Sequence, residues 1–343
     1  MVLDFFNTQI YLLFVIIILS ISEILKNNNS FSDTILSILS INSKIPKKWA
    51  FSFMVAILGM LPIPGRIVIV NFLLDAVVSK ENPRAHRLGT LAYISTHHYY
   101  LWSPIETAVI ISLGILKISY SEFLSYMVYP ILGYMIFYLL YIIFFIKETD
   151  FKEVIVSNSK INYNSLWDII ILFLSIIIAM VISNEKAMVV IFLIPLIILI
   201  IKYKISFKNI ILNLDYKFIT SIFIILCIGF LIKNTVILKD ILKFISTSSF
   251  NLFIIFLICF AFSFLFGSSS RYATIAGNMA LLLGIQFFPL LYIVDYCGYI
   301  LSPVHKCTFF IFSYFKYTVQ FILILCILCL SVFFPSYAIF IFK

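Results

Sequence analysis

The stretch Gly267–Asn278, with the sequence GSSSRYATIAGN, interrupts a chain that is otherwise mostly hydrocarbon. It is small and polar, carries one arginine, and lies between the apolar arms Phe250–Phe266 and Met279–Gly284. Irregular polar backbone survives at membrane depth only where protein buries it or where it lines a water-filled cavity. A charged residue at that depth indicates a functional site. We therefore expect the rest of the chain to hold this stretch inside a membrane.

The composition supports this interpretation. The 343 residues are 63% hydrophobic and 11% charged, with a mean hydropathy of +1.13. Long continuous apolar runs recur from end to end, which excludes a soluble domain and favours helices over the alternating segments of a β-barrel. The net charge of +9 does not indicate nucleic-acid binding, because the Lys and Arg residues lie in short loops between the runs.

Two segments are too short to cross a membrane alone. Trp49–Met60 and Ile67–Val78 each measure about 18–20 Å as a helix, against a hydrocarbon core of about 30 Å. Between them, the two prolines and the glycine of Leu61–Arg66 force a turn. This pattern predicts a re-entrant hairpin, and Phe250–Gly284 predicts a second one, with its tip over residues 267–271.

Full-length apolar runs account for the rest of the chain. A first span is expected over 5–25, followed by an interfacial stretch over Phe31–Ile41. The later spans are expected over 88–116, 120–146, 166–182, 187–201, 218–232, 288–312 and 317–340. The sequences Trp102-Ser103-Pro104 and Leu301-Ser302-Pro303 break two of them. The expected fold is an all-α polytopic membrane protein with about nine spans and two hairpins.

The order hairpin, broken span, full span occurs twice. SPIE at 103–106 returns as SPVH at 302–305, Arg66 and Arg271 occupy the two hairpin tips, and Asn71 and Asn278 follow them. These matches predict an inverted repeat. The expected division of the chain is a first span with its loop over 1–46, a first unit over 47–147, a linker with three plain spans over 148–249, and an inverted unit over 250–343.

The loop charges agree with an inverted second unit. With the amino terminus outside, fifteen of the 24 Lys and Arg residues fall in inside loops and six fall outside. Such an excess is typical of cytoplasmic loops. The expected location is therefore the inner (plasma) membrane, with several passes.

The interrupted helices indicate a binding site. A helix that ends inside the membrane presents free N–H groups to anions or free C=O groups to cations. Arginine adds a planar fork that matches a carboxylate or phosphate. The expected substrate-binding residues lie at the hairpin tips and breaks: Gly65, Arg66, Asn71, Ser103, Ser268, Ser269, Ser270, Arg271, Asn278 and Ser302. The alternative is structural: the arginines pair with Glu106, Asp75 or Asp295, and the serines pack helices.

A second set of residues could carry a coupling ion. Glu106 and His305 follow the two Ser-Pro breaks at the same position, so either could carry a proton, and His97, His98 and Thr274 are further candidates for a proton or sodium. No metal site is expected, because the spacing of His97, His98 and Glu106 does not fit one helix face. The six cysteines are interpreted as small apolar residues, and no cofactor is expected.

Three blocks resemble a known family. They are LPIPG at 61–65, the His- and aromatic-rich run Tyr93–Pro104, and GYILSPVH at 298–305. Over roughly residues 45–340 they are similar to the prokaryotic membrane family known as domain of unknown function 401, which resembles the ion transporter superfamily of gluconate permeases and sodium-coupled citrate and dicarboxylate carriers. The resemblance implies organic-anion transport with substrate between the hairpin tips. Arg66 departs from the family pattern, in which a small residue follows Gly65.

The sequence therefore predicts a secondary transporter of a small, organic anion, driven by sodium or protons, rather than an enzyme. The motifs HExxH and GxSxG are absent from the sequence. A non-transporting receptor or assembly protein of the same fold is the alternative. The expected partners are the anion and the lipid bilayer, with a homodimer left open and no nucleic acid.

Overall fold

All secondary structure described for this chain is helical. The computed structural model describes residues 2–26, 46–60, 70, 74, 77–78, 84–151, 163–182, 185–214, 216, 219–220, 223–224, 251–267, 269–305, 307–308 and 319–342. Three helices are long and apolar enough to cross a membrane, over Tyr120–Phe145, Lys186–Tyr203 and Val319–Ala338. The interfacial stretch Phe31–Ile41 and the first hairpin tip lie outside the described residues, as does nearly all of the span expected over 218–232.

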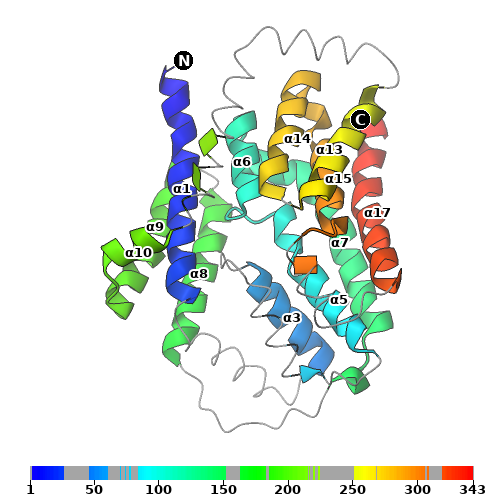
Figure 1. Cartoon of the computed structure of the whole chain (residues 1–343), viewed down its shortest axis with the longest axis horizontal. Helices are drawn as coiled ribbons and strands as arrows, with labels where there is room; N and C mark the ends of the chain where they lie inside the picture. Colours follow the sequence, from blue (N-terminus) through cyan, green and yellow to red (C-terminus); the bar gives the residue numbers. More distant parts are fainter. Residues whose placement is uncertain are drawn as a thin grey trace.

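The helices form two groups (Figure 1). A peripheral group, at the left of the figure, packs α1 and α8 against α9, with the short α10 beside α1. Its bounds are α1 Val2–Lys26, α8 Tyr163–Ile182, α9 Glu185–Tyr203 and α10 Phe207–Asn213. Helix α1 also touches the second group through α6. The sequence predicted a loop where α10 lies, because seven residues give too weak a periodic signal.

The second, central group holds the interrupted helices. From the first half of the chain it takes α3 Lys47–Met60, α5 Ala85–Ser95, the 3₁₀ turn η1 His98–Leu101, α6 Thr107–Leu116 and α7 Tyr120–Phe145. From the second half it takes α13 Asn251–Phe266, α14 Ser269–Leu283, η3 Ile285–Phe287, α15 Phe288–Leu301 and α17 Val319–Phe342. Helices α7 and α17 pack against each other across the two halves.

Both expected broken spans are present, but the first break begins earlier than predicted. Helix α5 ends at Ser95 and α6 begins at Thr107, and between them the chain passes through η1 and residues 102–106. Helix α15 ends at Leu301, directly before Ser302 and Pro303. Proline lacks the N–H that would continue a helix, which explains the end of α15 before Pro303, whereas α5 ends nine residues before Pro104.

Helices α13 and α14 meet at Gly267, which has a φ of +61°. The Gly267 N–H donates to the Ser263 carbonyl at 2.9 Å, which ends α13 with a left-handed residue that glycine tolerates best. A Cβ here would also lie 2.7 Å from the backbone nitrogen of His305. Helix α14 begins already at Ser269, so the expected irregular tip over 267–271 was too long.

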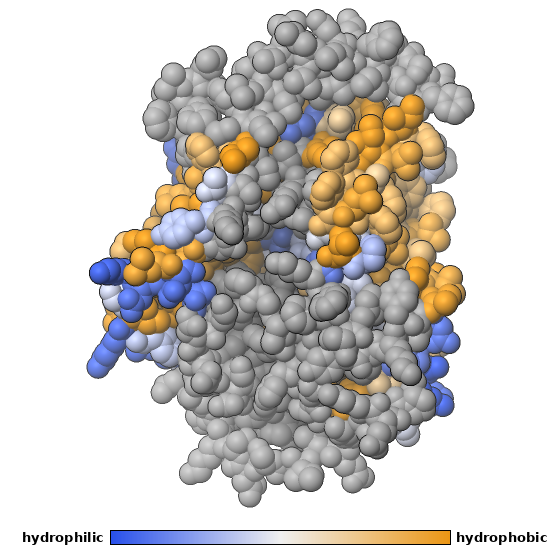
Figure 2. All heavy atoms as spheres, in the orientation of Figure 1, coloured by the Kyte–Doolittle hydropathy of each residue, from blue (hydrophilic) through white to orange (hydrophobic). Residues whose placement is uncertain are grey.

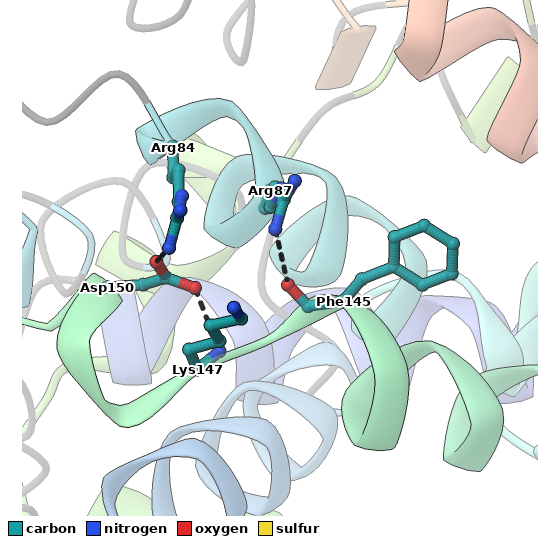
Figure 3. A network of polar contacts seen from close by, with 5 residues as sticks. All are labelled: Arg84, Arg87, Phe145, Lys147 and Asp150. Carbon is teal, nitrogen blue, oxygen red and sulfur yellow. Dashed lines mark hydrogen bonds and ion pairs between the residues drawn. The ribbon is translucent and has the colours of Figure 1, made fainter.

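One end of the central group is fixed by charge (Figure 3). Asp150, from η2 Glu148–Asp150, accepts a hydrogen bond from the Lys147 N–H at 2.8 Å and pairs with Arg84 at 3.9 Å. Arg87 donates to the Phe145 carbonyl at 3.3 Å. The start of α5 is thereby tied to the end of α7, so both helices have an end on the same side of the molecule.

The outer faces of the long helices are apolar. Exposed large hydrophobic side chains recur along α7, α8, α9, α13 and α17. Figure 2 shows such side chains over α13, at the upper right, and hydrophilic side chains around α10, at the left. This distribution is the one expected where lipid contacts the protein.

Candidate functional site

The two breaks meet inside the central group. His97, which follows α5, and His305, which follows α15, bring their Nε2 atoms to 3.0 Å from each other. Both side chains are buried, with exposed fractions of 0% and 5%. His305 also faces the turn between α13 and α14, with its Nδ1 3.3 Å from the Gly267 carbonyl oxygen. Three interruptions, from two halves of the chain, therefore share one interior point.

Backbone carbonyls set the tautomers of this pair. His97 Nδ1 lies 2.6 Å from the Tyr93 carbonyl oxygen, and His305 Nδ1 faces the Gly267 carbonyl. Because a carbonyl oxygen only accepts, each Nδ1 donates its hydrogen there, and in the neutral ring Nε2 then carries a lone pair. At 3.0 Å the two Nε2 atoms are within hydrogen-bonding distance, with a proton or a metal ion able to lie between them. The pair is chemically suited to a shared proton or to a metal ion.

His98 points elsewhere. Its Nδ1 accepts a hydrogen bond from the Trp102 indole at 2.9 Å, so its Nε2 donates to the Ala56 carbonyl at 3.2 Å. These contacts tie η1 to α3 and give His98 a bonding role at the first hairpin arm. At Gly59, α3 also packs closely against the chain after α5, because a Cβ there would lie 2.7 Å from the Thr96 Cα.

Tyrosines from each half cover the carbonyls of the other half. Tyr93, before the first break, donates to the Ile300 carbonyl at 2.8 Å. In the reverse direction, Tyr292 donates to the Tyr100 carbonyl at 2.7 Å and Tyr296 to the His97 carbonyl at 3.3 Å. We call Tyr93, Tyr292 and Tyr296 the cross-break tyrosines.

The cross-break tyrosines were not among the residues predicted from the sequence. The available signal was the spacing of Tyr292, Tyr296 and Tyr299, which places them on one face of a helix. Carbonyls at helix ends were expected to offer cation sites, but those of Ile300, Tyr100 and His97 already accept hydrogen bonds from hydroxyls.

Several predicted site residues surround this point. Ser302 is fully buried and donates to the Phe264 carbonyl at 2.6 Å, near the end of α13. Glu106 is buried and is the N-cap residue of α6. Among the described residues, Ser103 Oγ and Asn278 Oδ1 are buried without a hydrogen-bond partner. A buried polar atom of this kind is available to a bound molecule.

The amino-terminal ends of α6 and α14 complete the site. The two helices pack side by side, with Gly277 against Ile115 (Figure 1). Both begin near the breaks, α6 directly after Glu106 and α14 directly after the turn at Gly267. Their free N–H groups therefore give the interior a partial positive charge, which favours an anion.

The remaining predicted residues are only partly described. Gly65, Arg66, Asn71 and Ser268 lie outside the described residues. The backbones of the others lie in the first two turns of α14, and their side chains are not described: Ser269, Ser270, Arg271 and Thr274. Of the carboxylates expected to pair with an arginine, Asp295 accepts a hydrogen bond from Ser263, and its pairing with an arginine stays a prediction.

A cysteine joins the histidine pair. One nitrogen of His97, one nitrogen of His305 and Cys307 Sγ all lie within 4.8 Å of one another. Sequence spacing led us to expect no metal site. That expectation considered only residues on one helix, whereas this group forms across the two breaks.

Comparisons with known proteins place the fold. No family model matches the chain, and no curated protein sequence matches it. The crystal structure of the Alcanivorax borkumensis YdaH transporter is similar, with a TM-score of 0.52 and 9% identity, over 99% of this chain and 86% of that one. At this identity the likeness shows the fold alone. The chain is a membrane protein whose described secondary structure is helical, with a fold found in a transporter, and its resemblance to domain of unknown function 401 stays a prediction.

Proposed function

We propose that this protein is a secondary transporter of a small organic anion, coupled to sodium or protons. The observation that carries the proposal is the convergence of both breaks and the α13–α14 turn at His97 and His305. Interrupted helices that meet in the interior are the usual construction of substrate sites in secondary transporters. The fold shared with the YdaH transporter supports the same class.

The anion is inferred from the helix ends and the arginines. Helices α6 and α14 direct their amino-terminal ends toward the breaks, and Ser103 and Asn278 add buried polar atoms. Arg271 belongs to the first turn of α14. Together with Arg66, it would supply the fork that grips a carboxylate.

The repeat supports the transport interpretation. We infer that 47–147 and 250–343 are inverted copies, because each contains a hairpin arm, a span broken at Ser-Pro and a full-length helix. In such folds, one repeat rocks or slides against the rest of the protein to expose the site to either side. Glu106, a buried carboxylate at the start of α6, is the first candidate for a coupling residue.

Flux into proteoliposomes tests the proposal. Purified protein is reconstituted, and uptake of labelled mono-, di- and tricarboxylates is measured under an imposed sodium gradient, an imposed pH gradient, or neither. We expect accumulation of at least one anion under one gradient. Absence of gradient-dependent flux for every anion, from protein that binds an anion in a thermal-shift screen, would favour the receptor alternative.

A charge-conserving pair of variants tests the arginine fork. Arg271→Lys keeps the charge and loses the bidentate geometry, so we expect weaker uptake and a raised KM. Arg87→Lys is the matched control, because Arg87 lies at the far end of α5 and bonds a carbonyl. Equal uptake by both variants would remove Arg271 from the binding site.

A further inference from the structure

We propose that His97, His305 and Cys307 form a transition-metal site, suited to zinc or to another ion that prefers nitrogen and sulfur ligands. The three ligand atoms lie within 4.8 Å of one another. They come from the two breaks, which are 208 positions apart at the two histidines. Two imidazoles and one thiolate are a ligand set that selects zinc-like or softer ions over magnesium, calcium or sodium.

The rings of His97 and His305 are oriented as those of metal-binding histidines usually are. Metal-binding histidines usually donate their other N–H to a backbone carbonyl or carboxylate, which fixes the tautomer and directs the lone pair at the ion. Both histidines have this arrangement, His97 on the Tyr93 carbonyl and His305 on the Gly267 carbonyl. The two Nε2 atoms consequently meet at one point, where an ion would replace the hydrogen bond between the rings with two metal–nitrogen bonds.

Neighbouring tyrosines hold both histidine rings rigidly in place. The His97 ring stacks on Tyr93 with centroids 4.2 Å apart, and the His305 ring lies 4.2 Å from Tyr299. Tyr299 is joined in turn to Tyr100 by a hydrogen bond between their hydroxyls. Buried rings held in this way lose little freedom when an ion binds, which favours affinity.

The distances between the three ligand atoms are close to those in a tetrahedral zinc site. Tetrahedral zinc, with Zn–N bonds of about 2.0–2.1 Å and Zn–S bonds of about 2.3 Å, separates two nitrogens by about 3.3 Å and a nitrogen from a sulfur by about 3.6 Å. The 3.0 Å between the histidines is close to the first value. The 4.8 Å limit for the group leaves a movement of about 1 Å for Cys307 Sγ, which a side-chain rotation supplies.

The Cys307 thiol distinguishes a metal ion from a proton shared between the two histidines. One proton between the two Nε2 atoms would involve the two histidines alone. A metal ion uses all three groups and deprotonates the thiol on binding. Zinc with three protein ligands also keeps a fourth position for water or a small anion.

Metal binding to the purified protein is the test, and it requires no transport. The detergent-solubilised protein is stripped with chelator, loaded with Zn²⁺, desalted and analysed for metal and protein. We expect one zinc per chain. Replacement by Co²⁺ should give visible bands of tetrahedral cobalt and a thiolate-to-cobalt charge-transfer band, both of which Zn²⁺ should abolish.

Variants locate the ion. Cys307→Ser should remove the charge-transfer band, and His305→Ala should weaken zinc binding by more than the about 10–100-fold typical of an outer-shell change. Cys326→Ser and His86→Asn are matched controls outside the group and should bind as the unchanged protein does. A monodisperse elution profile shows that each variant is folded, and the conservative Cys307→Ser is decisive if His305→Ala fails to fold.

Three results would overturn the proposal. The first is zinc far below one per chain at saturation. The second is binding that Cys307→Ser and His305→Ala leave unchanged. The third is a nitrogen-15 NMR spectrum in which the two histidines share a proton and do not change on adding Zn²⁺. Since no anion flux enters any of these measurements, the metal site and the transport function stand or fall separately.

Discussion

Ser302 Oγ donates a hydrogen bond to the Phe264 carbonyl at 2.6 Å and so joins the second break to the end of α13. Phe264 lies in the last turn of α13, where carbonyls lack partners within the helix. Ser302 is buried and Phe264 is half-buried, whereas Leu265 and Phe266 at the end of α13 are exposed. The contact therefore replaces the hydrogen bonds that water would provide.

Ser302→Ala should destabilise the protein. The half-buried Phe264 carbonyl would lose this donor, at a cost of about 1 kcal/mol. Thermal unfolding in detergent measures the loss. Ser175→Ala is the control, because Ser175 bonds the Ile171 carbonyl of its own helix, α8, at 2.9 Å, where that carbonyl also accepts a helical N–H. Equal shifts for both variants would argue against a special role for Ser302.

Gly298→Ala should separate α15 from α13. A Cβ at 298 would collide with the Phe260 carbonyl oxygen, a backbone atom of α13 that has little freedom to move. We expect a loss of about 1–3 kcal/mol or more. Gly277→Ala is the matched control, since its Cβ would meet the Ile115 side chain at 3.3 Å, which can rotate away. A smaller effect at 298 than at 277 would contradict the close approach of these helices.

Tyr93→Phe should lower the stability of the contact between the two breaks. The variant keeps the ring that stacks on His97 but removes the hydroxyl that donates to the Ile300 carbonyl and accepts from Thr308 at 3.2 Å. One buried carbonyl loses its donor, at about 1–3 kcal/mol. Tyr129→Phe, on the exposed face of α7, should be neutral. Unfolding temperatures of the two variants within error of each other would refute the capping role.

Glu148→Ala should loosen the start of α3. The Glu148 carboxylate accepts hydrogen bonds from the Lys47 N–H at 2.8 Å and the Lys48 N–H at 3.3 Å, which are the first amides of that helix. Losing an N-terminal cap costs about 0.5–2 kcal/mol, so these amides should exchange hydrogen about 2–30 times faster.

Hydrogen exchange read by mass spectrometry resolves this effect by segment. Glu122→Ala, at the exposed first turn of α7, serves as its control and should leave exchange in α3 unchanged. Exchange in α3 that is the same with and without Glu148 would show that packing alone holds the helix.

Local chemistry made two of the interruptions predictable. Pro303 cannot continue α15, and Gly267 suits a left-handed turn, so these two interruptions can be inferred from a few neighbouring residues, whereas Pro104 does not explain why α5 ends at Ser95. The contact between His97 and His305 has no such local cause. The repeat pattern aligned His305 with Glu106, whereas packing of the two halves brings it against His97, a residue at a different position in its unit. Such a pairing depends on how α5 and α15 approach each other.

The cross-break tyrosines also restrict how the molecule could change shape. Pulling the breaks apart would strip hydroxyl donors from buried carbonyls of both halves at once, whereas α1 touches the central group mainly along α6. If the protein transports as proposed, a slide of the whole central group past α1, α8 and α9 keeps these hydrogen bonds and costs less than a movement of one repeat against the other. A disulfide engineered between α1 and α6 would arrest that slide, while one between the breaks would leave it free.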